Sequence, residues 1–227
     1  MSEIQRTTVG ERVEVASDTG TGTGPSSDTG TGSGSGSGAD ERLRLAVVVA
    51  STREGRFAPT VAAWFTGQAA HRLDLDIDVI DLAGANLPDA LSGRPGPEVA
   101  AMTGRIDAAD AFVIITPEYN HSFPAPLKTA IDWHYEEWRA KPVGFVSYGG
   151  LSGGLRAVEH LRQVFAELHA VTVRDTVSFH GAASCFDDSG APVDPTGPEA
   201  AAKTMLDQLT WWGRTLRDGK TARPYAA

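Results

Sequence analysis

The sequence predicts an α/β fold in which a five-stranded parallel sheet lies between two layers of helices. Short apolar runs alternate with segments of helical periodicity, a pattern that favours strand–helix–strand units. The runs "LRLAVVVA" (43–50) and "AFVIIT" (111–116) are apolar almost throughout. Continuous apolar runs are typical of strands covered on both faces, as in a parallel sheet.

Five strands are expected in chain order. The segment "LDIDVIDL" alternates apolar and polar residues, which is typical of a strand nearer an edge. The five predicted strands cover residues 43–50, 75–82, 111–116, 142–148 and 171–179.

Five helices are expected between and after these strands. The first has Pro59 in its first turn, where proline is tolerated. Apolar residues recur at helical spacing in three of them. These sets are Val61, Trp64, Phe65 and Ala69; then Leu155, Val158, Leu161, Phe165 and Leu168; then Met205, Leu209, Trp212 and Leu216. The other two helices are predicted over 97–109 and 125–138.

The chain divides by composition into a tail and one domain. Residues 1–40 are rich in Gly, Ser and Thr, and we expect them to be a disordered, flexible tail. Residues 41–227 are long enough for one domain with a real core. The formal net charge is -9, with no basic stripe, which argues against a nucleic-acid partner.

The cysteine count and the apolar runs limit location and metal chemistry. Cys185 is the single cysteine, which fits a reducing cytoplasm and excludes a disulfide framework within the chain. No run approaches the length of a membrane span, and the N-terminus lacks the apolar core of a signal peptide. The six histidines are scattered without metal-ligand spacing, so no metal site is expected.

The turn "ASTREGRFAP" (50–59) predicts an anion site. Ser51 offers a hydroxyl, Arg53 and Arg56 offer planar donors, and a following helix would present unpaired N–H groups. Gly55 lets the backbone approach a ligand closely. The alternative is a plain strand–helix turn with two solvated arginines.

The turn "TPEYNHS" (116–122) and the loop "SYGGLSGGLR" (147–156) follow the third and fourth strands. Tyr119 is expected to form an aromatic wall with Asn120 as a polar edge, although Tyr119 in the core is the simpler alternative. The simpler alternative for Glu118 is that it holds the turn's own amides. The four glycines of the later loop would let bare backbone approach a flat polar ring.

A serine hydrolase is a weaker interpretation of the same glycine loop. Gly150 to Gly154 reads G-x-S-x-G between a strand and a helix, which would make Ser152 a nucleophile. Its partners would have to be Asp175 and His180, both near the last predicted strand. Since no later strand ends are left to supply them, this interpretation is disfavoured.

An anion site, an aromatic wall and a glycine loop suit a ligand with a phosphate at one end and a flat ring at the other, such as FMN. With "STREGR", "PEYNHSFPAPLKTAIDW" and "SYGGLSGG", the chain resembles the NADPH-dependent FMN reductases of the flavodoxin-like superfamily over residues 43–180. The resemblance implies a three-layer flavodoxin-like fold with sheet order 2-1-3-4-5.

The resemblance also implies roles for individual residues. Ser51, Arg53 and Arg56 would hold the FMN phosphate. The residues Pro117, Glu118, Tyr119 and Asn120 would border the ribityl chain and ring. The residues Ser147, Gly149, Gly150, Ser152 and Gly153 would contact the ring edge.

The activity implied is hydride transfer from NADPH or NADH to flavin N5, and then reduction of a flavin, quinone or similar acceptor. Since FMN carries the chemistry, no dedicated catalytic side chain is expected. The family resemblance further implies a homodimer or homotetramer. Trp133 and Trp138 could serve the contact between subunits, and a place in the buried core is the equal alternative for both. A non-enzymatic FMN-binding electron carrier or redox-sensing interaction protein is the alternative.

Overall fold

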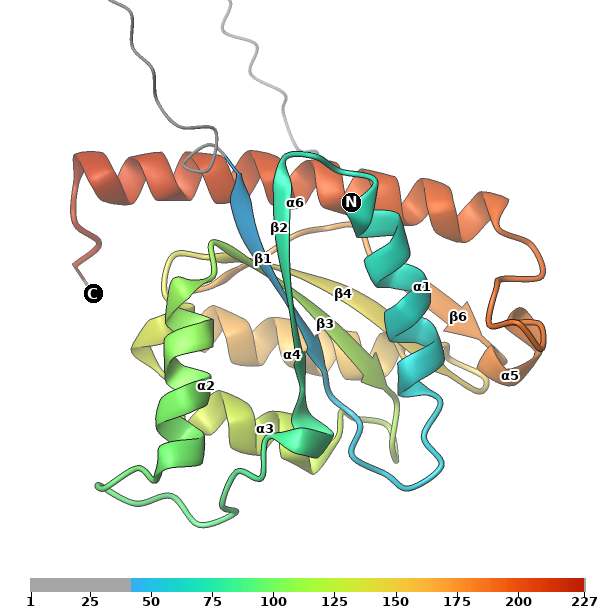
Figure 1. Cartoon of the computed structure of the whole chain (residues 1–227), viewed down its shortest axis with the longest axis horizontal. Coiled ribbons are helices and arrows are strands. Elements are labelled where there is room, and N and C mark those ends of the chain that lie inside the picture. The colour runs from blue at the N-terminus through green and yellow to red at the C-terminus, as the bar shows by residue number, and fades with distance from the viewer. Residues whose placement is uncertain (1–41, 227) are drawn as a thin grey trace, which may run out of the picture. The chain divides into compact units, whose positions relative to one another are not determined.

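The sheet has the predicted parallel order (Figure 1). The computed structural model describes residues 42–226, and the predicted flexible tail over residues 1–40 lies outside them. The order is β2-β1-β3-β4-β5, and a further strand, β6, also pairs with β4. The strands of the described part are β1 (Leu43–Val49), β2 (Leu75–Asp81), β3 (Ala111–Pro117), β4 (Pro142–Gly149), β5 (Val171–Thr172) and β6 (Val177–His180).

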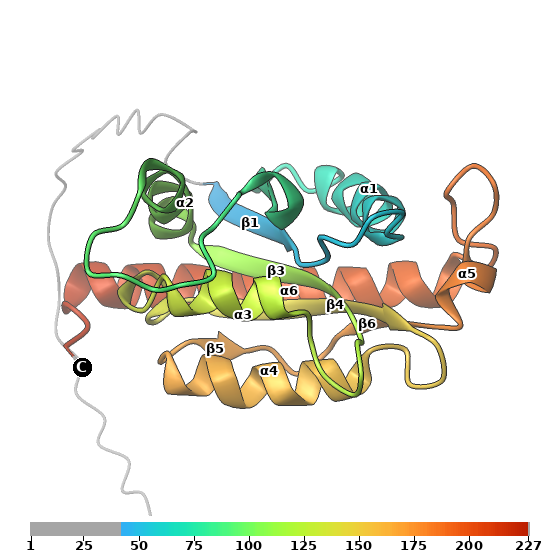
Figure 2. The same cartoon turned by 90° about the horizontal axis from the view of Figure 1, so that it is seen from below.

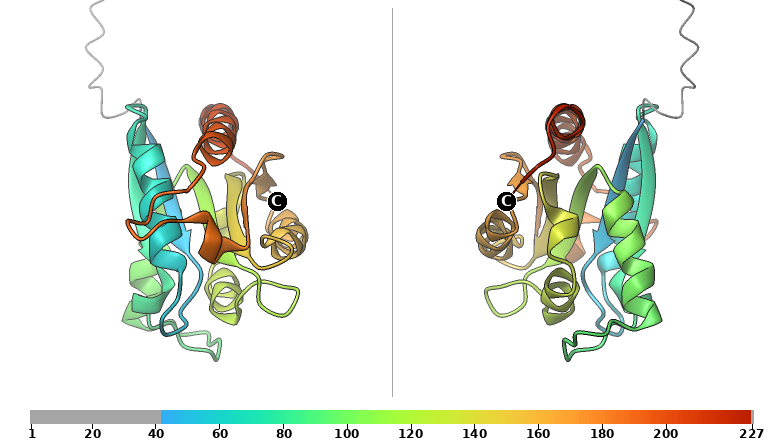
Figure 3. Two further views of the ribbon diagram at one scale, coloured as in Figure 1. Left: turned by 90° about the vertical axis from the view of Figure 1, so that its right-hand side faces the viewer. Right: turned by 90° about the vertical axis from the view of Figure 1, so that its left-hand side faces the viewer.

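Helices cover both faces of the sheet (Figure 3). One apolar layer forms between the sheet and the helices α1 (Ala58–Ala70) and α6 (Thr196–Ala222), with the short α5 (Ala182–Cys185) beside it. The other layer forms with α2 (Pro97–Ala108), α3 (Ala125–Asp132) and α4 (Leu155–Glu167). Two 3₁₀ turns, η1 (Leu82–Gly84) and η2 (Glu136–Trp138), complete the described elements. Within this part of the chain, no helix is both long enough and apolar enough to cross a membrane.

Burial along the strands follows their place in the sheet. All seven residues of β3, the central strand, are buried. In β2, at the edge, buried and exposed residues are mixed, as its alternating sequence predicted. The apolar core therefore consists of two layers separated by β1, β3 and β4.

The predicted fifth strand is divided into β5 and β6, a correction to the five-stranded prediction. Arg162 of α4 donates to the carbonyls of Val173 and Arg174 at 2.7 and 2.9 Å. The side chain of Gln208, from α6, accepts from the N–H of Asp175 at 3.2 Å. These side chains take the place of sheet partners, so the strand leaves β4 and rejoins it at Val177.

The third helix is shorter than the predicted 125–138, because a histidine ring interrupts it. The N–H of His134 donates to the carbonyl of Ile131, and its ring Nδ1 lies 2.7 Å from the carbonyl of Ala130. In a continued helix, the N–H of His134 would bond to the carbonyl of Ala130. The ring of His134 occupies that carbonyl instead. The chain then turns through η2 and buries Trp138 against Phe112, with ring centroids 4.5 Å apart. Buried in this way, Trp138 is not available for a contact between subunits.

One predicted helix face differs at its first residue. Val158, Leu161 and Phe165 of α4 are buried, as is Leu168 directly after it, whereas Leu155 is 41% exposed. Leu155 is the first residue of α4 and follows the glycine loop directly. Its side chain lies outside the apolar layer that the rest of this face forms with the sheet. Its neighbour Leu151 in that loop is 90% exposed.

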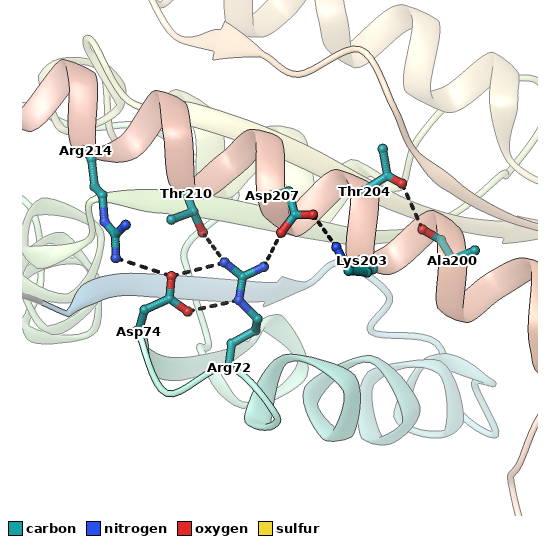
Figure 4. A network of polar contacts seen from close by, with 8 residues as sticks. All are labelled: Arg72, Asp74, Ala200, Lys203, Thr204, Asp207, Thr210 and Arg214. Carbon is teal, nitrogen blue, oxygen red and sulfur yellow. Dashed lines mark hydrogen bonds and ion pairs between the residues drawn. The ribbon is translucent and has the colours of Figure 1, made fainter.

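An ion-pair network fastens α6 to the turn between α1 and β2 (Figure 4). Arg72 pairs with Asp74 at 2.9 Å and with Asp207 of α6 at 2.5 Å. Arg214 of α6 reaches Asp74 at 3.3 Å. Each pair is partly exposed and worth little alone. Because Asp74 and Arg72 each serve two partners, the network fixes the position of α6 against α1.

Close packing of α6 on β4 depends on Gly144. A Cβ at this position would lie 3.0 Å from both Leu209 Cδ1 and Met205 Sδ of α6. We predict that Gly144→Ala lowers the free energy of unfolding by about 1–3 kcal/mol, because the Leu209 and Met205 side chains must move out of their packed positions. The matched control is Gly104→Ala in α2, where a Cβ would meet nothing within 4 Å. In this control the free energy of unfolding should rise by about 0.5–1 kcal/mol, because alanine has a higher helix propensity than glycine. Urea titrations measure both, and equal effects would contradict the packing argument.

Candidate functional site

The three turns predicted to carry chemistry leave the sheet at one edge (Figures 1 and 2). They follow β1, β3 and β4, which are neighbours in the sheet and run parallel. Parallel strands place their carboxyl ends together, and ligands of such sheets bind there.

A hydrogen bond joins the first turn to the second. Ser51 is fully buried, and its Oγ lies 2.8 Å from the hydroxyl of Tyr119, either atom being able to donate. The two residues are 68 positions apart in the chain. The tyrosine is only half-buried. Its phenol therefore links the two turns, and its role as an aromatic wall stays a prediction.

Arg56 is held by an acidic residue that the sequence analysis did not select. Its guanidinium donates to both carboxylate oxygens of Asp81 at 2.6 Å and to the carbonyl of Ser51 at 2.6 Å. The hydrogen bonds to Asp81 raise the pKa of Arg56, and Arg56 in turn lowers the pKa of Asp81. The available signal for Asp81 was an acidic residue at the end of β2, on the same sheet edge. Arg56 thus braces the first turn, and its contact with a phosphate stays a prediction.

Arg53 is placed differently from Arg56. It is exposed, and no described residue forms an ion pair with it. Gly55 beside it has φ +62°, a left-handed conformation that glycine adopts without strain. The backbone N–H groups of residues 52–55 find no acceptor among the described residues. They lie just before α1, whose N-terminus has no side-chain cap. The turn therefore presents backbone donors and an unengaged guanidinium together.

The second turn is a tight reversal. Tyr119 and Ser122 exchange two backbone hydrogen bonds, at 2.8 and 3.0 Å. Asn120 and His121 between them have φ of 50° and 74°. Positive φ at both central positions is the mark of a type I′ turn, which asparagine tolerates better than most residues. This geometry turns the chain back sharply at the edge of the sheet.

Glu118 connects the second turn to the glycine loop and does not take the simpler alternative of holding its own turn's amides. Its carboxylate accepts from Ser152 Oγ at 2.5 Å, and from the N–H and guanidinium of Arg156 at 3.2 Å each. Burial raises the pKa of Glu118, but these donors outweigh burial and leave it below its usual value. The carboxylate is therefore an ionised anchor for the loop.

The glycine loop is fastened from beneath by two serines. Ser147, fully buried, and Ser178 of β6 donate to the carbonyl of Gly153 at 2.8 and 2.9 Å. Gly153 and Gly154 have φ of +60° and +87°. The hydroxyl of Ser147 thus holds the loop from the interior, and its predicted contact with a ring edge stays a prediction. Ser178 was not selected from the sequence.

The outer half of the loop is open. Gly150 is exposed, and a Cβ there would meet nothing within 4 Å. Its carbonyl accepts from the N–H of Gly181 at 2.9 Å, which holds the loop against the end of β6. At Gly149 a Cβ would come within 3.3 Å of the backbone nitrogen of Gly154. Bare backbone is therefore exposed at Gly150 and crowded at Gly149.

The hydrolase interpretation finds no support in the geometry. Ser152 donates to Glu118 and not to a histidine. The ring of His180 faces Ser178 Oγ and the carbonyl of Leu151, at 3.2 Å each. A serine nucleophile needs a histidine base within hydrogen-bond reach, and none of the described histidines bonds to Ser152.

Comparison with known proteins relates this arrangement to flavin and quinone reductases. A sequence model of the family described as NADPH-dependent FMN reductase matches residues 43–184, which include all three turns. The NADPH:quinone oxidoreductase of Arabidopsis thaliana is 32% identical over 174 residues, covering 72% of this chain and 89% of that protein. The quinone reductase of Escherichia coli (strain K12) is 32% identical over 179 residues, covering 75% and 91%.

A third relative matches over a shorter stretch. An NAD(P)H-dependent FMN reductase of Schizosaccharomyces pombe is 35% identical over 122 residues, which cover 49% of this chain and 60% of the relative's length. Among solved structures, a flavoenzyme NAD(P)H:(acceptor) oxidoreductase from Paracoccus denitrificans superposes with a TM-score of 0.63 at 23% identity, covering 76% of this chain and 98% of that one. The predicted flavodoxin-like fold is confirmed.

The glycine loop supplies a test of its own geometry. At Gly154 a Cβ would lie 2.6 Å from the Cβ of Ser147 and 2.9 Å from the nitrogen of Tyr148. We predict that Gly154→Ala lowers the free energy of unfolding by about 2 kcal/mol or more, since clash and left-handed strain act together. Gly150→Ala is the matched control and should change it by less than about 0.5 kcal/mol. Thermal unfolding measures the stability of both variants. A Gly154→Ala variant that is as stable as the wild type would contradict the prediction and show that the loop can rearrange.

Proposed function

The chain belongs to the NADPH-dependent FMN reductase family, and on that premise we propose that it is an FMN-dependent NAD(P)H oxidoreductase. Its acceptor would be a small molecule, a flavin or a quinone. The observation that carries the proposal is the linkage of the three turns, through Ser51–Tyr119 and Glu118–Ser152, into one preformed site.

The residues present fit FMN at both ends of the cofactor. At the first turn, unpaired backbone N–H groups and the exposed Arg53 suit a phosphate. At the glycine loop, the exposed backbone of Gly150 suits the polar edge of a flat ring. Tyr119 and Asn120 lie between these two places along the sheet edge and would border the ribityl chain.

The chain's own groups would bind and orient, while bound FMN would accept hydride from NADPH or NADH and pass electrons to the acceptor. Glu118 is ionised and already accepts three hydrogen bonds, so it would not serve as a proton donor. It would keep Ser152 and the glycine loop in one position. Fixing the loop before the ligand arrives reduces the ordering cost of binding.

We extend the proposal to the acceptor, the assembly and the location. Relatives named as quinone reductases support a quinone acceptor. The exposed Leu151 and Leu155 at the rim of the glycine loop would be covered in a homodimer or homotetramer. The single cysteine suits a cytoplasmic protein.

The test measures reduction as well as binding. The full chain is loaded with FMN, and its oxidation of NADPH and of NADH is followed with and without a benzoquinone. We expect turnover that requires FMN and rises with the quinone. An FMN-loaded protein that oxidises neither nucleotide would favour the non-enzymatic carrier, and a chain that takes up no FMN would refute both functions.

The phosphate role of Arg53 can be tested separately. We predict that Arg53→Ala weakens FMN binding by about 1.5–3 kcal/mol, the size of a charge-assisted hydrogen bond, and leaves riboflavin binding unchanged. Arg94→Ala, at an exposed arginine outside the three turns, is the control. Calorimetric titration gives both affinities. Unchanged FMN affinity in Arg53→Ala would remove this residue from the phosphate site.

A further inference from the structure

Tyr148, near the end of β4, carries a buried hydroxyl that nothing described satisfies. The residue is 5% exposed, and its Oη has no hydrogen-bond partner in residues 42–226. Its ring packs edge-on against Phe57, the residue before α1, with centroids 6.1 Å apart. The side chain therefore extends from β4 across the sheet towards the first turn.

An unpaired hydroxyl is an unfavourable feature in a core. Burying one without a partner costs stability, and phenylalanine would fill the same space without that cost. The neighbouring aromatic positions, Phe57 and Phe186, pack ring against ring with no polar atom. The ring of Tyr148 is therefore enough for packing, and the hydroxyl oxygen adds nothing to it.

The groups around this hydroxyl belong to the proposed phosphate site. Burial is the main cause that raises the pKa of Tyr148 well above its ordinary value, and Tyr119 adds to it, while Ser51 and Arg56 oppose it. The phenol consequently keeps its proton throughout the physiological range. Ser51 and Tyr119 are already bonded to each other, and Arg56 to Asp81. Tyr148 Oη has Ser51, Tyr119 and Arg56 as neighbours, and it makes no hydrogen bond of normal length to any of the residues 42–226.

We infer that Tyr148 Oη donates a hydrogen bond to the phosphate of bound FMN and so helps the chain select FMN over riboflavin. This inference rests on the proposed function. The phosphate would be held from two sides, by the first turn with Arg53 and by a phenol from β4. A neutral donor placed in the core adds a directional contact without adding charge to the site.

The test is Tyr148→Phe in the full chain, with dissociation constants measured for FMN and for riboflavin by flavin fluorescence. We expect the constant for FMN to rise about 10- to 100-fold, since the acceptor is charged, and the constant for riboflavin to stay within about two-fold. The variant loses only one unpaired oxygen, so its ligand-free form should unfold at the same temperature as the wild type or higher. Tyr135→Phe, on an exposed tyrosine, is the matched control and should change none of these values.

Three results would overturn the inference. FMN affinity that survives in Tyr148→Phe would show that the hydroxyl does not reach the phosphate, while leaving the proposed function intact. Equal loss of FMN and riboflavin would place the hydroxyl at the ring or the sugar. A ligand-free variant that is clearly less stable than wild type would reveal a structural partner. Failure of the wild type to bind FMN would instead refute the proposed function itself.

Discussion

The parallel direction of β1, β3 and β4 is the constraint on which the site depends. Helices cover both faces of the sheet, so these strands are apolar along their length and polar groups collect at their ends. Because the three strands are neighbours, the turns that follow them lie at one edge. No single turn would bind a cofactor well, and the sheet brings their separate donors together.

Side chains then join the turns into a site that exists without its ligand. The bond between Ser51 and Tyr119 links the first two turns, and Glu118 links the second turn to the glycine loop through Ser152. Asp81 holds Arg56 against the first turn from a fourth strand end. Each bond is modest in water, but together they hold the loops in one arrangement, which would lower the ordering cost of the proposed cofactor binding. The buried phenol of Tyr148 carries the opposite cost, because its Oη has no hydrogen-bond partner among residues 42–226.

Several side chains have partners that only the folded chain reveals. Arg56 and Ser147 are the residue types expected to meet a ligand, yet their hydrogen bonds go to Asp81, to the carbonyl of Ser51 and to Gly153. The fifth strand reads as one run but is divided, because Arg162 and Gln208 supply hydrogen bonds from two helices. Local sequence patterns cannot predict these hydrogen bonds, because the bonded residues are 11 and 33 positions apart along the chain.

By itself, the sequence determined the order of strands and helices, the two-sided burial of the sheet and the three turns at its edge. Those features follow from local periodicity and from the rule that parallel strands end together, which need no knowledge of distant contacts. Only the tertiary structure decided which donors have partners within residues 42–226: there, Arg56 rather than Arg53 meets a carboxylate, and the buried Tyr148 hydroxyl has no partner. The reason is that a hydrogen bond forms over about 3 Å, and side chains from different strands reach that distance only when the sheet has assembled.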